Sequence, residues 1–274
     1  GELEMMTKAM NRALACSCAT AVLLLLAPIG WAQQSAQNQN QGATSSTLVP
    51  KDARTRAKAH TELGALYFQS GNLIVALEEL TLAAAIDPEY ATAFSTRALV
   101  LYHVKEYESA EKDFQRAISL DGRNPEINNN YGWYLCQTGK ANEAIPYFER
   151  AYRNPLYQTP ALAYLNEGAC YIKLNQLDLA DEALRKSLRL MPENPQAFFH
   201  LANASYKRGN FDAAKKHLSD AVRFVDPGPE LLWLFLRVER RLGNENDERS
   251  LAAQLRRKFP DSPEYQELLK GNFE

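Results

Sequence analysis

Residues 124–151 read NPEINNNYGWYLCQTGKANEAIPYFERA and contain the unit from which the chain is built. The pattern predicts two helices of about a dozen residues each, separated by a turn at Gly139. Each helix carries one small residue, Gly132 on the first and Ala144 on the second, where the two helices would approach closely. A single helix pair cannot bury its own apolar side, so it requires neighbours of the same kind.

The same pattern recurs along the chain at a nearly constant period. The turn position is occupied in succession by Gly71, Lys105, Gly139, Asn175, Gly209 and Gly243, at steps of 34, 34, 36, 34 and 34 residues. A helix–turn–helix unit of this period is typical of tetratricopeptide repeats (TPRs). The sequence therefore predicts an all-α TPR solenoid, a right-handed superhelix of about six repeats followed by a C-terminal capping helix.

Small and large residues also keep their register. The first small position holds Gly64, Ala98, Gly132, Gly168 and Ala202, and the second holds Ala76, Ala110, Ala144, Ala180 and Ala214. Four residues after the second small position stands a large apolar side chain: Leu80, Phe114, Phe148, Leu184 and Leu218. We expect it to fill the groove beside the closely packed helices. The sixth unit has Leu236 and Glu248 at the small positions, so we expect a terminal repeat that approaches a cap.

The helix boundaries follow from the turns and prolines. We expect the first helices near 53–69, 91–103, 125–137, 160–174, 195–207 and 229–241. We expect the second helices near 73–85, 107–119, 141–153, 177–190, 211–224 and 245–258. Pro146 falls inside a second helix and predicts a mild local distortion. The longer step predicts an extended hinge at residues 154–160, between the third and fourth units.

The domain boundaries combine the repeats with the N-terminal composition. Lys8 and Arg12 precede an apolar run over residues 13–27, and small residues stand at 30 and 32, which is the pattern of an export signal. We therefore predict a signal peptide at 1–32, a flexible polar linker at 33–52 and a TPR domain at 53–274. Within that domain we place repeats near 57–90, 91–124, 125–160, 161–194, 195–228 and 229–262, and a cap at 263–274.

Two other interpretations of the N-terminal segment are weaker. The apolar run is shorter than the roughly 20 residues that a membrane-spanning helix needs, so an anchor is less favoured than a cleaved signal. Cys16 and Cys18 raise the possibility of lipidation. A lipid-bearing cysteine must follow the apolar run, however, and no cysteine lies between Ala19 and Gly30. Lipidation is therefore not favoured.

The concave side of such a superhelix is formed by the first helices, and we expect it to bind a partner. Counting from the start of each unit, the inward positions include many aromatic and amide side chains. Aromatic rings would bury side chains of an extended peptide, and amides would bind its backbone. The predicted partner-binding groove consists of Phe68, Gln69, Tyr102, Asn129, Asn130, Trp133, Asn166, Phe199, Asn203, Tyr206, Trp233 and Arg237. The alternative for each ring is packing against a neighbouring helix.

Enzymatic function is disfavoured by the residue pattern. The histidines, His60, His103, His200 and His217, fall on separate repeats without metal-ligand spacing, and no Gly-rich phosphate loop is present. Cys136 and Cys170 lie on neighbouring first helices. We expect two buried thiols there, ahead of a disulfide or of a nucleophile with His103 as base. No cofactor, metal or catalytic residue is predicted, and the net charge of −2 does not favour nucleic acid.

Several segments resemble the type IV pilus biogenesis and stability proteins called PilF or PilW. They are residues 129–132, 154–157, 166–168, 183–190 and 256–265, and the match covers roughly residues 57–266. The resemblance implies a non-catalytic, six-repeat TPR pilotin. It also implies that the protein escorts the secretin subunit of the type IV pilus to the outer membrane and promotes secretin multimerisation.

The resemblance also indicates partners and location. The secretin and other pilus-assembly proteins would be the partners. Members of this family usually carry a lipid on the cysteine after the signal, and this chain has no cysteine there. We therefore expect a periplasmic protein that is associated with the outer membrane through its partners. The alternatives are a general periplasmic TPR scaffold of another envelope complex and, less favoured, an accessory or enzyme acting on envelope polymers.

Overall fold

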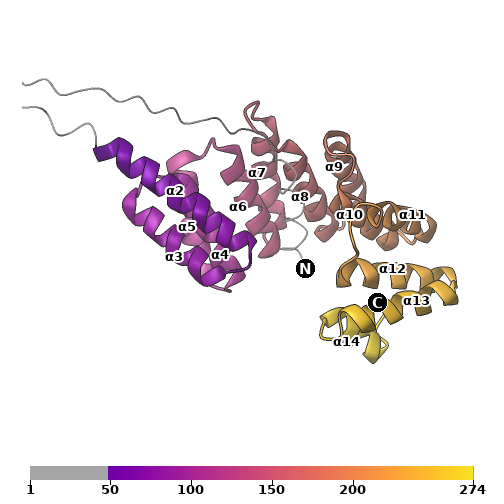
Figure 1. Cartoon of the computed structure of the whole chain (residues 1–274). Helices are drawn as coiled ribbons and strands as arrows, with labels where there is room; N and C mark the ends of the chain where they lie inside the picture. The colour runs from indigo at the N-terminus through magenta and orange to yellow at the C-terminus, as the bar shows by residue number, and fades with distance from the viewer. Residues whose placement is uncertain (1–48, 274) are drawn as a thin grey trace, which may run out of the picture.

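The computed structural model describes residues 49–273 (Figure 1). The predicted signal peptide and residues 33–48 of the predicted linker lie outside this part. The first, or A, helices of the repeats are α2 (Val49–Gln69), α4 (Ala91–His103), α6 (Pro125–Gln137), α8 (Pro160–Lys173), α10 (Pro195–Lys207) and α12 (Pro229–Leu242). The second, or B, helices are α3 (Leu73–Ile86), α5 (Tyr107–Asp121), α7 (Ala141–Arg153), α9 (Leu177–Leu190), α11 (Phe211–Ala221) and α13 (Glu245–Lys258), and α14 (Pro263–Lys270) follows.

The predicted all-α TPR solenoid is confirmed, and two helix boundaries differ clearly from expectation. Helix α2 begins at Val49, so the last four residues of the predicted linker are helical. Helix α11 ends at Ala221 and not at 224, because residues 222–224 form a turn in which the Phe224 amide bonds to the Ala221 carbonyl. Helix α7 spans Ala141–Arg153 with Pro146 inside it, as predicted, and the mild distortion expected at Pro146 stays a prediction.

The turn between the two helices of each repeat requires a left-handed backbone. All six turn residues have positive φ, from 57° at Asn175 to 86° at Gly139. Four of the six are glycine, which adopts this conformation without a Cβ clash. Lys105, with φ of 68°, is the one turn residue that combines this conformation with a long side chain. The turn geometry therefore explains why the period is visible at this position.

Close approach of the two helices explains the small residues. A Cβ atom on Gly168 would lie 2.6 Å from Cγ of Leu184, and one on Gly132 would lie 2.9 Å from Cε1 of Phe148. Leu184 and Phe148 are fully buried, so the glycines leave room for the large side chain of the same repeat.

The sixth repeat exchanges the two sizes. Leu236 occupies the register position of Gly132 and is fully buried, whereas Ala252 occupies the position of Phe148. A large residue on the A helix therefore accompanies a small one on the B helix. This exchange preserves the combined side-chain volume, which the prediction of a repeat drifting toward a cap did not anticipate.

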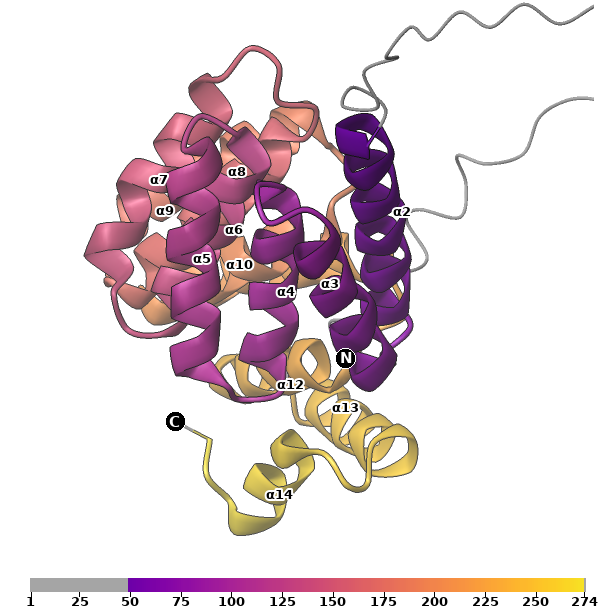
Figure 2. The ribbon, with the colours of Figure 1, turned by 90° about the vertical axis from the view of Figure 1, so that its left-hand side faces the viewer.

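The A helices form the inner layer of the superhelix. Each A helix packs on the next one, from α2 on α4 to α10 on α12, whereas within residues 49–273 successive B helices have no Cα atoms within 8 Å of each other. Viewed from the α2 end, the later repeats lie behind the first ones and turn progressively, so that α12 and α13 lie below them (Figure 2). The concave surface is therefore lined by A helices, as predicted.

The junction between the third and fourth repeats is fixed by side-chain contacts. Asn154 donates from Nδ2 to the carbonyl oxygen of Arg123 at 3.1 Å, and its Oδ1 accepts from the Leu156 amide at 2.9 Å. Tyr157 is buried against Ala151. The predicted hinge is thus a loop that is fixed at Asn154 and Tyr157.

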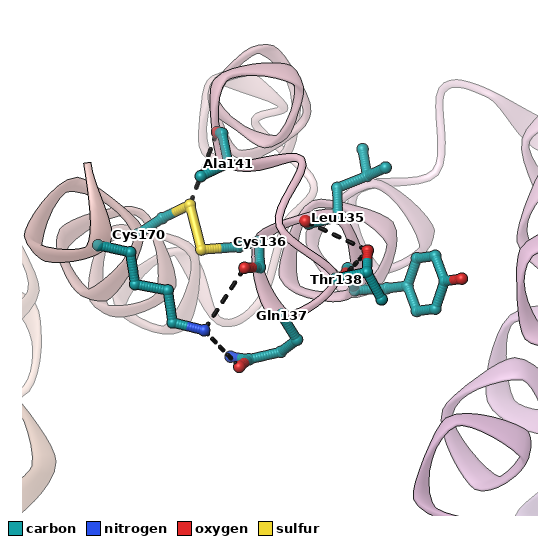
Figure 3. The surroundings of a disulfide bond; sticks show 8 residues. Leu135, Cys136, Gln137, Thr138, Ala141 and Cys170 are labelled. Carbon is teal, nitrogen blue, oxygen red and sulfur yellow. Dashed lines mark hydrogen bonds between the residues drawn. A yellow bond between two sulfur atoms is a disulfide. The ribbon is translucent and has the colours of Figure 1, made fainter. Parts of the chain in front are cut away.

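A disulfide joins the same two repeats. Cys136 on α6 and Cys170 on α8 are bonded, with their Cα atoms 5.8 Å apart (Figure 3). The expectation of two separate buried thiols is therefore wrong. Both residues are buried, as expected, but their positions on the facing sides of adjacent A helices bring the sulfur atoms together.

Candidate functional site

Most of the predicted groove residues keep some exposed surface on the A helices. Eleven of the twelve are partly exposed, and Asn129 is the exception, with 2% of its surface accessible. Their environments divide the concave surface into three parts. These are an aromatic cluster at the first three repeats, an amide-rich middle and a basic cleft at the last two repeats.

The aromatic cluster consists of Phe68, Tyr102, His103 and Trp133. The ring centroids of Tyr102 and Trp133 are 5.0 Å apart, edge to face, and those of Phe68 and His103 are 5.1 Å apart. His103 also stacks on Trp133 at 6.0 Å. Three successive A helices thus contribute rings to one half-buried surface, although the rings also pack on one another. The alternative of packing between neighbouring helices therefore applies to these rings, and binding of a partner by their exposed surface stays a prediction.

In the middle of the surface, polar groups bond across neighbouring A helices. Asn166 donates from Nδ2 to Oδ1 of Asn129 at 3.0 Å, and Asn130 donates to the Ser95 hydroxyl at 3.4 Å. The Lys173 ammonium donates to Oε1 of Gln137 at 2.6 Å. Part of the hydrogen-bonding capacity predicted for a partner is therefore used to connect repeats.

His200 lies on the same inner surface, on α10, next to Phe199 at a ring distance of 5.4 Å. Burial, together with the nearby positive charge of Lys173, lowers the pKa of His200 to about 4. The imidazole is therefore neutral at neutral pH.

The basic cleft lies between α10 and α12 and has a volume of about 530 Å³. It brings together three of the predicted groove residues with four others. Its lining consists of Asn203, Tyr206, Lys207, Gly209, Phe211, Arg237 and Arg241. Sequence reasoning missed Lys207 and Phe211 because they belong to the turn-side ends of α10 and α11, whereas the register count selected only inward positions of the A helices.

The C-terminal residues lie beside this cleft. The Phe273 ring stacks on Trp233 at 5.6 Å, and its carbonyl oxygen accepts from Arg237 Nε at 3.3 Å. Arg240 lies over the same ring at 3.9 Å. Helix α14 contacts α12 and α13, as expected of a cap, and the segment after it covers part of the predicted groove at Trp233. No sequence signal pointed to Phe273.

Glu167 is a buried carboxyl group on the outer side of α8. Only 4% of its surface is exposed, and its Oε1 accepts from the Tyr152 hydroxyl at 3.4 Å. Burial raises its pKa to about 7, and the nearby Glu149 acts in the same direction. Glu167 is isolated from the inner surface, so we assign it to the packing between the third and fourth repeats.

Residues 49–273 contain neither a cluster of metal ligands nor a free thiol. No group of three or more His, Cys, Asp and Glu side chains in residues 49–273 is arranged to hold a metal ion. The two cysteines of this region are bonded to each other and supply no thiol. Over the same residues, no helix has the length and apolar content needed to cross a membrane.

Comparison with known proteins identifies the repeats and their closer relatives. Two tetratricopeptide repeat models match, at residues 95–158 and 171–232. The type IV pilus assembly protein PilF of Pseudomonas aeruginosa is 29% identical over 210 residues, covering 77% of this chain and 83% of the relative.

Solved structures give the same result. The crystal structure of PilW, described as a widely conserved type IV pilus biogenesis factor, superposes with a TM-score of 0.71 at 32% identity, covering 78% of this chain and 98% of that structure. The structure of P. aeruginosa PilF superposes with a TM-score of 0.66 at 27% identity, covering 80% of this chain and 99% of that one. From the extent and identity of the PilW match, together with the repeat architecture, the chain belongs to the family of TPR-containing type IV pilus biogenesis proteins.

Proposed function

We propose that this protein is a non-catalytic adaptor of type IV pilus assembly. It binds segments of the pilus secretin on its concave surface and promotes localisation and multimerisation of the secretin. The observation that carries the proposal is the half-buried ring cluster of Phe68, Tyr102, His103 and Trp133, contributed by three consecutive A helices. Aromatic side chains on a concave surface are well suited to bury apolar side chains of an extended peptide.

The proposal treats the concave surface as a rigid, preformed binding groove. The A helices are held at fixed distances by the cross-helix amide bonds, the pinned junction and the disulfide. A preorganised surface loses little conformational entropy when a peptide binds, so modest contacts suffice for affinity. Membership in a pilus biogenesis family supports a pilus component as the partner.

The proposal includes location. The protein acts in the periplasm and is associated with the outer membrane through its partners. Fractionation of native cells with mass analysis of the amino terminus tests this part. A mature terminus at Gln33 supports export and cleavage, whereas a lipid-modified cysteine indicates direct anchoring.

Co-purification with the secretin tests the central claim. We expect the secretin to co-purify with the wild-type protein and to be lost from a Tyr102→Ala, Trp133→Ala variant. Tyr147→Ala is the matched control, because Tyr147 is a half-buried aromatic residue on B helix α7. Equal secretin recovery with the groove variant and the control would refute the assigned surface.

Recovery of a different envelope complex without secretin would favour the second candidate, a general periplasmic TPR scaffold. The generic TPR matches at residues 95–158 and 171–232 are the observation that supports this candidate. An accessory or enzyme acting on envelope polymers is the least favoured candidate. It would need polymer-modifying activity in the purified protein.

A further inference from the structure

The basic cleft between α10 and α12 differs electrostatically from its surroundings. It is lined by Lys207, Arg237 and Arg241 and by no acidic residue. Neighbouring cations are paired: Arg208 with Asp178 and Asp181, and Arg240 with Glu248 at 2.7 Å. In the part of the chain that the structure describes, none of the three cleft cations takes part in an ion pair with a carboxylate.

Aromatic rings hold two of these cations in place. The Arg237 guanidinium carbon lies 4.6 Å from the centroid of the Tyr206 ring, and that of Arg241 lies 5.0 Å from the centroid of Phe211. The two rings contact each other edge to face at 5.4 Å. A guanidinium held over a ring face keeps N–H groups in its own plane available, and a pair of these groups matches the two oxygens of a carboxylate. In Arg237, Nε donates to the Phe273 carbonyl, so the two terminal nitrogens provide this pair.

Next to the cleft, the protein already binds a peptide segment of its own. Phe273 places its ring between Trp233 and Arg240, and its carbonyl oxygen accepts from Arg237 Nε at 3.3 Å. One face of α12 therefore provides a ring site and a backbone donor. Arg237 connects this face to the basic cleft, since it lines the cleft as well.

We propose that the basic cleft binds a carboxylate of an extended peptide segment from a partner protein, either an acidic side chain or a C-terminal carboxylate. The inference rests on the proposed function only in taking a polypeptide as the ligand. It adds a second contact point, selective for anions, at the end of the concave surface opposite to the aromatic cluster. The observations favour a peptide over an anionic membrane because the cations line a concave cleft beside a site that accepts a backbone carbonyl.

Fluorescence anisotropy with a defined probe tests the proposal. The probe is a fluorescein-labelled peptide of sequence Gly-Ser-Phe-Asp-Asp-Gly with an amidated C-terminus, titrated with the full chain at low and moderate salt. We expect saturable binding that weakens with salt and with Asn in place of both Asp residues. A Gly-Ser-Phe-Asn-Asn-Gly peptide with a free C-terminus separates the two carboxylate sources, because its binding would assign the cleft to a terminal carboxylate.

Charge-neutral variants locate the site. Arg241→Gln and Lys207→Gln should each weaken probe binding by about tenfold. Arg256→Gln is the matched control, since Arg256 is exposed on α13 and the substitution changes the net charge equally. Circular dichroism melting curves confirm that each variant is folded.

Three results would overturn the inference. The first is that neither carboxylate peptide binds, and the second is that Arg256→Gln weakens peptide binding as much as Arg241→Gln does. The third is that the protein binds phosphatidylglycerol vesicles but not the peptides, and that Arg241→Gln abolishes vesicle binding. The proposed function is tested separately, by comparing secretin co-purification with the wild type and with the Tyr102→Ala, Trp133→Ala variant. Peptide binding without secretin recovery would retain the cleft and reject the partner.

Discussion

Cys136 and Cys170 join α6 to α8 by a disulfide, with a Cα–Cα distance of 5.8 Å, so the third and fourth repeats are linked covalently as well as by packing. The bonded cysteines are 34 residues apart in the sequence, and the segment between them contains α7 and the loop at Asn154. It therefore lies at the one junction where the repeat period is interrupted.

Removing this disulfide should destabilise the protein. Closure of a loop of this length is worth about 3–4 kcal/mol in the chain-entropy model, because it restricts the unfolded chain. We expect a Cys136→Ala, Cys170→Ala variant to unfold at clearly lower urea concentration than the wild type and to be insensitive to dithiothreitol. Reductant should shift the wild type toward the variant. Identical midpoints for wild type and variant, with and without reductant, would show that the bond contributes nothing.

Lys105→Gly should stabilise the second repeat. Lys105 holds a left-handed backbone at φ of 68°, which costs a residue with a Cβ roughly 1–2 kcal/mol, and glycine has no such penalty. Glycine makes the unfolded chain more flexible, so we expect a net gain of about 1 kcal/mol, measured by urea unfolding. Asn175→Gly is the matched comparison and should gain less, because asparagine tolerates this conformation. A loss of stability in Lys105→Gly would contradict the backbone argument.

Exchanging the small and the large residue at the helix crossing of the fourth repeat should destabilise the protein less than the two single changes added together. Gly168→Leu should cost roughly 1–3 kcal/mol or more through overpacking against Leu184, and Leu184→Ala should cost about 2–5 kcal/mol through a cavity. The double variant reproduces the arrangement of Leu236 and Ala252. It should cost about 0.5–3 kcal/mol less than the sum of the single changes in a double-mutant cycle. Strict additivity would show that the two positions are independent.

The sequence predicted the fold well because the repeat depends on local rules. A left-handed turn at Gly139 and its counterparts, and a close approach at Gly132, restrict residue type position by position, so they leave a visible period. The departures occur where other forces decide. Helix α2 begins at Val49, within the segment that composition assigned to the linker, because composition alone does not fix the residue at which a helix begins.

The candidate site was less predictable for a different reason. Register identifies which side of a helix faces inward, but not which neighbour a side chain contacts. Asn129 was predicted to line the groove, but its side chain is buried and its Oδ1 accepts a hydrogen bond from Asn166 on the next A helix. Phe273 lies outside the repeat, so no period marks its contact with Trp233. The cysteine pair required the actual distance between α6 and α8, which sequence spacing does not supply.

Glu167 makes stability depend on pH. Burial in the folded protein raises the pKa of Glu167 from its ordinary value of 4.5 to about 7, so the folded state binds more protons than the unfolded state between these values. The contribution of this group is therefore most favourable below pH 4.5 and is lost as the pH rises to about 7.

Glu167→Gln tests this linkage directly. The amide retains an acceptor for the Tyr152 hydroxyl and carries no charge, so the variant should be more stable than the wild type at pH 8, on the order of 1–3 kcal/mol, and nearly equal to it at pH 4.5. Urea unfolding at both pH values measures the difference. Glu182→Gln, an exposed acid on α9 paired with Lys186, is the matched control and should show little change. A variant no more stable than the wild type at pH 8 would contradict this prediction. It would mean that the ionised Glu167 carboxylate is solvated by protein dipoles or by water, although the packing between α7 and α8 excludes bulk solvent, so that its ionisation does not destabilise the fold.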